Sequence, residues 1–246
     1  MKMVHPPLIP PIEGGTTPSP LAGEGGGEGN YAMKQGLKEE LLGHGAMVVG
    51  FAGLRGHMSG ELAHLDKAVS IGVDRKLNED TLSLLMKLQK RAVRYLKSRG
   101  YRTLAIPPDS DRKMGKMISK LYKLFCHKTA ATCSGLGWIG KNGLIINEQY
   151  GSKMTWATVL TDAPLGTDRP YVASQCGECD LCVKHCPSGA VKGHLWTLGN
   201  PLREIVVYEK CRALKSGRTS LKEKPNCGFC VTVCPYSRNG GKHKVA

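Results

Sequence analysis

The apolar residues in the first half of the chain follow two different periods. Buried strands are predicted by three continuous apolar runs, at 46–51, 68–73 and 103–106. A short helix is expected at 34–42, and a longer one follows Asn78, a good helix cap, with leucines at helical spacing until Gly100. This succession of strand, helix and strand predicts an α/β layer.

Further along the chain the pattern changes. Residues 111–133 have helical character and carry many lysines and arginines, most of them expected to face solvent. The apolar runs 144–147 and 154–160 flank a turn near Gly151 and predict a β-hairpin. Residues 1–32 are rich in proline and glycine, which predicts a disordered tail.

Eight of the ten cysteines fall into two runs of related spacing. The first run, C-x2-C-x2-C-x3-C-P, consists of Cys176, Cys179, Cys182 and Cys186. The second is a looser copy with a distant leading cysteine and consists of Cys211, Cys227, Cys230 and Cys234. In such runs three thiolates wrap one cubane, while the cysteine before proline ligates the neighbouring cluster. The spacing therefore predicts cluster A on Cys176, Cys179, Cys182 and Cys234, and cluster B on Cys186, Cys211, Cys227 and Cys230.

Structural zinc and disulfides are the alternatives for these cysteines. Zinc sites typically read as paired C-x2-C motifs, or as C-x2-C with histidines, so three cysteines in a row at this spacing fit them poorly. Disulfides need an oxidising compartment, and the sequence shows no secretory segment. Two [4Fe–4S] clusters are the preferred interpretation, with electron transfer as the expected chemistry.

Composition sets limits on size, location and charge. The 246 residues have room for one sizeable domain and a small module, and the longest apolar stretches are too short to span a bilayer. We therefore expect a cytoplasmic protein without a membrane segment. The formal net charge is +15, which two oxidised clusters would bring to about +11. This charge would attract an acidic electron donor such as flavodoxin or ferredoxin, or tRNA, although a solvated surface without a partner explains it equally well.

The segment 135–140 matches the pattern G-x-G-x-x-G of dinucleotide-binding folds. That pattern requires a strand before the glycines and a helix after them, whereas here a helical segment precedes and a β-like run follows. A Rossmann turn is therefore disfavoured. Glycines beside Lys141 would still let backbone amides approach a cofactor or a phosphate closely.

Three sequence blocks stand in a fixed order ahead of the cysteine runs: 135–144 (GLGWIGKNGL), 150–151 (YG) and 160–165 (LTDAPL). In this arrangement the chain resembles the epoxyqueuosine reductase family and, more remotely, the corrinoid reductive dehalogenases. The resemblance covers about residues 45–240. From the resemblance we expect a short relative without the C-terminal helical-repeat extension that many family members use against tRNA.

The resemblance implies a cobalamin held against the two clusters, which would supply it with single electrons. In the family, the reduced substrate is the epoxide of a queuosine precursor in tRNA, but the substrate of this chain stays unidentified. The cofactor-binding candidates are Gly135, Gly137, Trp138, Gly140, Lys141 and Asp162. Their alternatives are core packing for the tryptophan, an ordinary surface position for the lysine and a turn before Pro164 for the aspartate.

The proton donor is the point at which the chain departs from the family. Family members place an aspartate upstream of the glycine block, but residues 112–147 contain no carboxylate. His127 could take its place because imidazole titrates near neutrality, and the alternative is a buried, hydrogen-bonded histidine. Cys126 and Cys133 lie outside the cysteine runs and are expected to act as small buried hydrophobes.

These inferences predict a tail at 1–32, an α/β (α+β) corrinoid-binding domain at 33–170, a bacterial ferredoxin-like domain with two [4Fe–4S] clusters at 171–240 and a basic tail at 241–246. The favoured function is that of an iron–sulfur oxidoreductase resembling epoxyqueuosine reductase. The alternative is a non-enzymatic electron carrier or a corrinoid-reducing partner protein, motivated by the missing carboxylate and the basic charge.

Overall fold

The computed structural model describes residues 27–58, 60–74, 79–108, 125–199, 204–216 and 227–238. Within these ranges the chain forms two compact units. The first contains the chain up to Leu136 together with 155–170, and the second contains 137–154 together with the chain from Tyr171 onward. The domain boundaries expected from the sequence stay predictions, and the structure groups the segment 137–154 with the cysteine-rich unit.

A four-stranded sheet with the order β1-β2-β6-β3 forms the centre of the first unit. Its strands are β1 (Val48–Gly53), β2 (Lys67–Asp74), β3 (Thr103–Ile106) and β6 (Met154–Thr161). β1 pairs with β2 and β3 pairs with β6, both in antiparallel register, so that Phe51 stands opposite Val69 and Leu104 opposite Leu160. The α/β class is confirmed, and the three strands expected upstream are all present.

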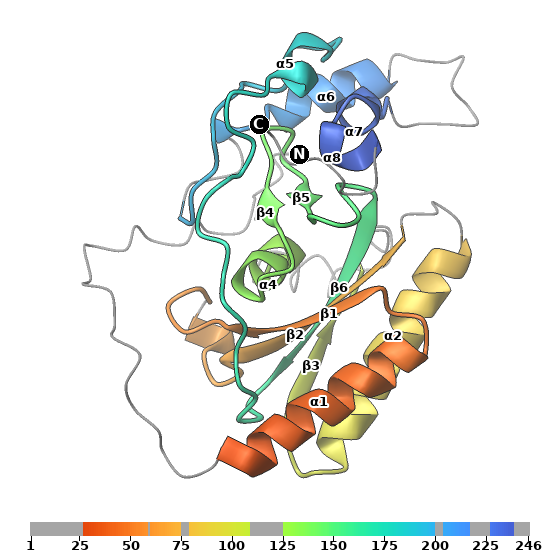
Figure 1. The fold of residues 1–246 in the computed structure, drawn as a ribbon, viewed down its shortest axis with the longest axis vertical. Coiled ribbons are helices and arrows are strands. Elements are labelled where there is room, and N and C mark those ends of the chain that lie inside the picture. The colour runs from red at the N-terminus through yellow and green to blue at the C-terminus, as the bar shows by residue number, and fades with distance from the viewer. Residues whose placement is uncertain are drawn as a thin grey trace. The chain divides into compact units, whose positions relative to one another are not determined.

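In the described part of the first unit, three α-helices and a short 3-10 helix accompany the sheet. They are α1 (Gly27–Gly43), η1 (Gly60–Leu62), α2 (Glu79–Lys97) and α4 (His127–Cys133). In Figure 1, α1 and α2 lie together on one face of the sheet, and α4 lies on the other. Six consecutive residues of β2 are buried, which fits a strand that is covered on both faces.

Helix α2 illustrates how the sequence builds the core. Leu85, Leu88 and Leu96 recur at helical spacing and are fully buried against the sheet, each contributing about 2 kcal/mol by leaving water. The helix ends at Lys97, and the chain turns away from it at Gly100, the expected stop, whose φ is +86°. The next N–H, that of Tyr101, returns to the Leu96 carbonyl at 3.2 Å. Asn78, the expected cap, lies outside the described residues.

Strand β1 lies at an edge of the sheet, and the segment after β6 covers it. Asp168 accepts the N–H of Phe51 through its carboxylate at 2.8 Å, and its own N–H donates to the Phe51 carbonyl at 2.8 Å. Lys34 on α1 pairs with the same carboxylate at 2.6 Å. The edge therefore leaves neither backbone group of Phe51 open to a foreign strand.

The second unit is built from a small hairpin and short helices. Strand β4 (Trp138–Ile139) pairs with β5 (Ile145–Ile146) in antiparallel register. The helices are α5 (Leu181–Lys184), α6 (Tyr208–Ser216), α7 (Phe229–Thr232) and α8 (Pro235–Arg238). Isolated bridges between Ala173 and Thr197 and between Val191 and Val206 hold the long connections together.

The hairpin expected from 144–147 and 154–160 is wrong. β5 pairs with β4, which lies within the glycine block 135–140. β6 joins the larger sheet beside β3. Nearly every residue of β6 is buried, which is typical of a central strand and not of one arm of an isolated hairpin. The disordered tail expected at 1–32 is wrong for residues 27–32, which form the first turns of α1. Residues 1–26, the part 111–124 of the basic segment expected at 111–133, and the last eight residues lie outside the described ranges. Within those ranges, no helix has the length and apolarity needed to cross a membrane.

Candidate iron–sulfur centre

The eight cysteines of the two runs all lie in the second unit, on or beside its short helices. Cys182 is in α5, Cys211 in α6 and Cys230 in α7, and Cys234 directly precedes α8. The remaining four stand in the turns that flank these helices. All ten cysteines are within the described ranges, and each has a free thiol. Thiolate is the form that binds iron, so the thiols are available as ligands.

One set of four thiols consists of Cys230 and three cysteines around it. Burial, together with the charges of Cys211, Cys227 and Cys186, raises the pKa of Cys230 to about 11. Cys186 belongs to the first run of the sequence, yet it acts on a residue of the second. The structure therefore brings together the four residues that the spacing predicts for cluster B.

A second set surrounds Cys182. Burial raises the pKa of Cys182 to about 12, and the charges of Cys176, Cys234, Cys230 and Cys179 contribute in that order. Three of these four are the residues predicted to share cluster A with Cys182. The fourth, Cys230, belongs to the other set, as expected if two centres lie close together. Without iron, each thiolate of a set repels the others, and cations bound among them would remove that repulsion.

Hydrogen bonds to sulfur already exist at both sets. The Ala190 N–H lies 3.3 Å from the Cys186 sulfur, and the Ser188 hydroxyl lies 3.6 Å from it. Burial acts to raise the pKa of Cys186, but these and other backbone hydrogen bonds outweigh it and leave the pKa below its ordinary value. Such bonds stabilise charge on sulfur and are one of the ways in which a protein sets a cluster potential.

In the second set, the Ser237 hydroxyl forms a hydrogen bond with the Cys234 sulfur. The same hydroxyl lies 2.7 Å from the Ser152 hydroxyl and accepts the Ser152 N–H at 3.0 Å. Both serines are almost fully buried. No sequence pattern indicates this pair, apart from the position of Ser152 directly after the Tyr150–Gly151 block.

Among the described residues, no three His, Cys, Asp or Glu side chains lie close enough to hold a single metal ion. This spacing is compatible with a cubane, because the four thiolates of a [4Fe–4S] cluster bind four different irons and stand further apart than the four ligands of one tetrahedral zinc. The chemistry of the donor set, four thiolates per group, fits the cluster.

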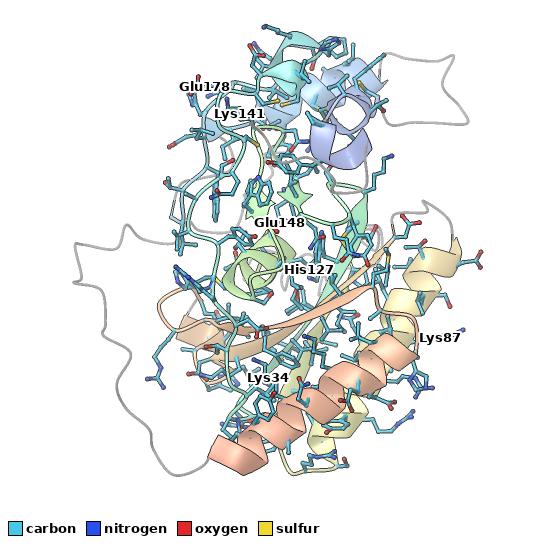
Figure 2. The ribbon with its side chains drawn as sticks, in the orientation of Figure 1. Lys34, Lys87, His127, Lys141, Glu148 and Glu178 are labelled. Carbon is cyan, nitrogen blue, oxygen red and sulfur yellow. The ribbon has the colours of Figure 1, made fainter. Side chains whose placement is uncertain are left out.

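The loop between β4 and β5 ties the two sets together. Lys141 is buried, and its ammonium donates to the carbonyl of Gly177, between Cys176 and Cys179, at 2.8 Å. Figure 2 shows Lys141 beside the cysteine loop that also carries Glu178. The neighbouring Asn142 amide donates to the Cys230 carbonyl at 3.1 Å. The side chain that the sequence offered as a cofactor anchor is thus bound to a cysteine loop, and Asn142 is a site residue that the sequence did not indicate.

The three glycines of the block serve close packing inside each unit. A Cβ at Gly135 would collide with the Arg169 carbonyl, and one at Gly137 with the Ile146 carbonyl. A Cβ at Gly140 would meet the side chain of Ile146. Protein atoms therefore fill the space that the missing side chains leave, whereas a cofactor cradle would leave this space open.

His127 is buried in the first unit with both ring nitrogens engaged. Nε2 lies 2.8 Å from the Pro107 carbonyl, and Nδ1 lies 2.8 Å from the Thr158 hydroxyl. A carbonyl only accepts, so Nε2 carries the proton, and in the neutral ring Nδ1 accepts from Thr158. Gln89 donates to the Thr158 and Ile106 carbonyls at 2.9 and 2.6 Å and extends the network. This geometry matches the structural alternative for His127, and its role as a proton donor stays a prediction.

Asp162 is bound to Arg102. Its carboxylate accepts the Arg102 N–H at 2.8 Å and the guanidinium Nε–H at 2.6 Å. Burial acts to raise the pKa of Asp162, but the hydrogen bonds and charge of Arg102 outweigh it, so the pKa lies below its ordinary value. The residue therefore fixes the turn after β6, which is the alternative that the sequence offered for it.

Comparison with known proteins places the cysteine-rich unit in a described class. Residues 175–237 match the family model of a 4Fe-4S double cluster binding domain. Epoxyqueuosine reductase from Cyclobacterium marinum is 33% identical over 116 residues, which cover 46% of this chain and 37% of that protein. The enzyme of the same name from Atelocyanobacterium thalassa is 29% identical over 153 residues, 52% of this chain and 49% of that protein.

The chain is related to the epoxyqueuosine reductases. The resemblance inferred from the sequence blocks is thereby confirmed, as is a ferredoxin-like double-cluster domain after the α/β domain. The chain spans less than half the length of the two curated relatives named above.

Solved structures of epoxyqueuosine reductases and reductive dehalogenases have a fold similar to that of this chain. An epoxyqueuosine reductase with a tRNA stem loop superposes with a TM-score of 0.61 at 20% identity, covering 87% of this chain and 68% of that one. A catabolic reductive dehalogenase in complex with 3-bromo-4-hydroxybenzoic acid gives 0.66 at 18% identity, covering 89% and 34%. A further dehalogenase structure, described with a mechanism for B12-dependent dehalogenation, gives 0.63 at 18% identity and covers 94% and 34%. At these identities the likeness concerns the fold.

Proposed function

We propose that the protein is an iron–sulfur reductase that passes single electrons through two [4Fe–4S] clusters to a cobalamin. The observation that carries the electron-transfer part is the gathering of eight thiols into two sets inside a domain that matches a double-cluster family. The relatives named above carry the names of reductases.

Within this proposal, cluster A is bound by Cys176, Cys179, Cys182 and Cys234, and cluster B by Cys186, Cys211, Cys227 and Cys230. The electrostatic contacts of Cys182 and Cys230 support this crosswise sharing. In this arrangement each cysteine run provides ligands for both clusters, so the two clusters would lie close together. A short distance favours rapid transfer of an electron from one to the other.

The cobalamin part rests on the relatives. Cobalamin, when bound, supplies a reduced cobalt that reacts as a strong nucleophile. Of the six residues proposed to hold it, three are glycines packed against protein atoms, and Lys141 and Asp162 are bound to Gly177 and Arg102. The structure therefore does not identify the residues that hold a corrinoid, and the contribution of this chain described below concerns its clusters.

The net charge of +15 supports two partners within this proposal. One is an acidic electron donor such as flavodoxin or ferredoxin, drawn by the opposite charge. The other is a tRNA, because one structural relative was solved with a tRNA stem loop and a basic protein attracts the phosphate backbone. A cytoplasmic location belongs to the same proposal.

Anaerobic reconstitution with iron, sulfide and cobalamin tests the proposal in one preparation. We expect about eight irons per chain, two cubane signals in the paramagnetic spectrum after reduction, and a corrinoid spectrum that stays with the protein through gel filtration. Zinc in place of iron would overturn the whole proposal. Two intact clusters without retained corrinoid would overturn only its cobalamin part.

A second candidate is an electron carrier that reduces a corrinoid protein or another acceptor. It is favoured by the engagement of five of the six corrinoid candidates in contacts within the protein. In that case the reduced clusters should reduce an external acceptor at a rate that falls steeply with added salt. A rate independent of salt would contradict docking through the basic surface.

A further inference from the structure

The indole N–H of Trp138 is buried without a hydrogen-bond acceptor among the described residues. Trp138 lies on β4 and is 1% exposed. An unpaired buried donor costs about 1–3 kcal/mol, so buried tryptophans usually place this group against an acceptor. A group that is absent from the polypeptide itself would satisfy it.

The side chains around Trp138 indicate where such a group lies. The indole packs against Ile146 and Cys234, with Cys176 at the border of the same cluster of side chains. Cys234 and Cys176 are two of the four thiols of the proposed cluster A. The indole therefore lies beside the volume in which that cluster would bind.

The two aromatic neighbours of Trp138 direct their own polar groups elsewhere. The ring of Tyr171 has its centroid 5.5 Å from that of Trp138, and that of Tyr236 lies at 5.0 Å in an edge-on arrangement. The Tyr171 hydroxyl donates to Glu148 at 2.5 Å, and the Tyr236 hydroxyl donates to the Gln175 carbonyl at 3.3 Å. Both tyrosine hydroxyls thus have acceptors of their own, and the indole N–H is the polar group of the three rings that lacks one among the described residues.

We infer that Trp138 donates its indole N–H to a sulfur of cluster A and thereby raises the midpoint potential of that cluster. The inference rests on the proposed assignment of the cysteines to clusters. Sulfides and cysteinyl sulfurs of a cubane are acceptors, and a hydrogen bond to them stabilises the reduced form, which carries one more negative charge. Trp138 would then adjust the potential of cluster A, whereas the sequence analysis named it as a candidate for binding the corrinoid.

The test compares the reconstituted full chain with its Trp138→Phe variant, which keeps an aromatic ring and removes the N–H. In the wild type exchanged into D2O, pulsed electron–nuclear double resonance of reduced cluster A should show a strongly coupled deuteron. In Trp138→Phe that coupling should be lost, and the equilibrium constant for reduction of cluster A should fall by up to about tenfold, which is about 59 mV for one electron. Trp196→Phe, the same change at another buried tryptophan of the unit, should alter neither quantity.

The outcomes separate this inference from the proposed function. Iron content and two cluster signals report on the function, and the deuteron coupling reports on Trp138. A Trp138→Phe protein with both clusters, an unchanged deuteron coupling and an unchanged potential would overturn the inference alone. If that variant fails to hold clusters, the wild type labelled with 15N-tryptophan decides: a nitrogen coupling at cluster A supports the inference, and its absence, or a coupling seen only at an added corrinoid cobalt, overturns it.

Discussion

The ammonium of Lys141 donates to the carbonyl of Gly177 at 2.8 Å, and so joins the β4–β5 loop to the first cysteine pair. Lys141 is almost fully buried, and among the described residues no ion pair with a carboxylate is found for it. A buried charge needs compensation, and an oxidised cubane with a charge of about −2 would supply it.

Replacing Lys141 by Met should therefore lower the midpoint potential of cluster A. Loss of the positive charge removes on the order of 1 kcal/mol of Coulomb stabilisation from the reduced cluster, and loss of the hydrogen bond loosens the cysteine loop. A redox titration followed by paramagnetic resonance measures the potential, with iron per chain as a second readout. Lys153→Met makes the same charge change at an exposed position and should leave both unchanged. Equal effects of the two variants would refute a specific role for Lys141.

Gly151 should not tolerate a side chain. Its φ is +64°, and a Cβ would collide with the backbone of Tyr236 and Ser237, next to Cys234. Gly189 has a similar φ of +58° but open space around it, so Gly189→Ala isolates the conformational cost of about 1–2 kcal/mol. We expect Gly151→Ala to lose clearly more stability than Gly189→Ala in urea unfolding, together with part of its iron. Similar losses in the two proteins would show that the close approach to Tyr236 does not matter.

The bond between His127 and Thr158 should be measurable as a coupling energy. His127→Leu, Thr158→Val and the double variant form a cycle in which we expect a coupling of about 1 kcal/mol, because either single change leaves a buried polar group unpaired. Urea unfolding of the four proteins under anaerobic conditions gives the value. A catalytic His127 predicts a different result, namely a large loss of turnover with little loss of stability and little coupling.

Cys133 should react slowly with alkylating reagents, with a rate that keeps rising above pH 9. Burial raises the pKa of Cys133 to about 11, so at pH 8 to 10 its reactive thiolate is a small fraction that grows about tenfold per pH unit. The same shift means that the stabilising effect of the protonated thiol is present below pH 9 and is lost as the pH rises through about 11. Mass spectrometry of peptides after timed labelling of cluster-loaded protein measures the rate. A rate that levels off near pH 9 would disagree with the buried thiol.

Pairs of cysteine substitutions should separate crosswise sharing from sharing within each run. Cys176→Ala with Cys234→Ala removes two ligands of one proposed cluster and should leave about four irons per chain. Cys176→Ala with Cys186→Ala removes two cysteines of one run, damages both proposed clusters and should leave far fewer. Iron analysis after anaerobic reconstitution measures the number of irons that each variant retains per chain. The reverse order of iron contents would mean that each run binds its own cluster.

The sequence by itself determined the features that depend on neighbouring residues. Helix α2 follows from apolar residues at helical spacing, and strand β3 from a short continuous apolar run. The predicted bounds of β3, 103–106, are the observed ones. The cysteine motif is equally local, because three thiolates at two-residue intervals can wrap one cubane whatever the rest of the chain does. These signals sufficed for the α/β class, the double-cluster domain and the relationship to epoxyqueuosine reductase.

The tertiary structure decided everything that joins distant positions. Strand β6 has the same apolar run whether it pairs with β5 or with β3, and only burial on both faces selects the larger sheet. Lys141 meets Gly177 across 36 positions, and Asn142 meets Cys230 across 88. No local pattern encodes such contacts, because they form where the packed core brings backbone carbonyls within reach of a buried donor.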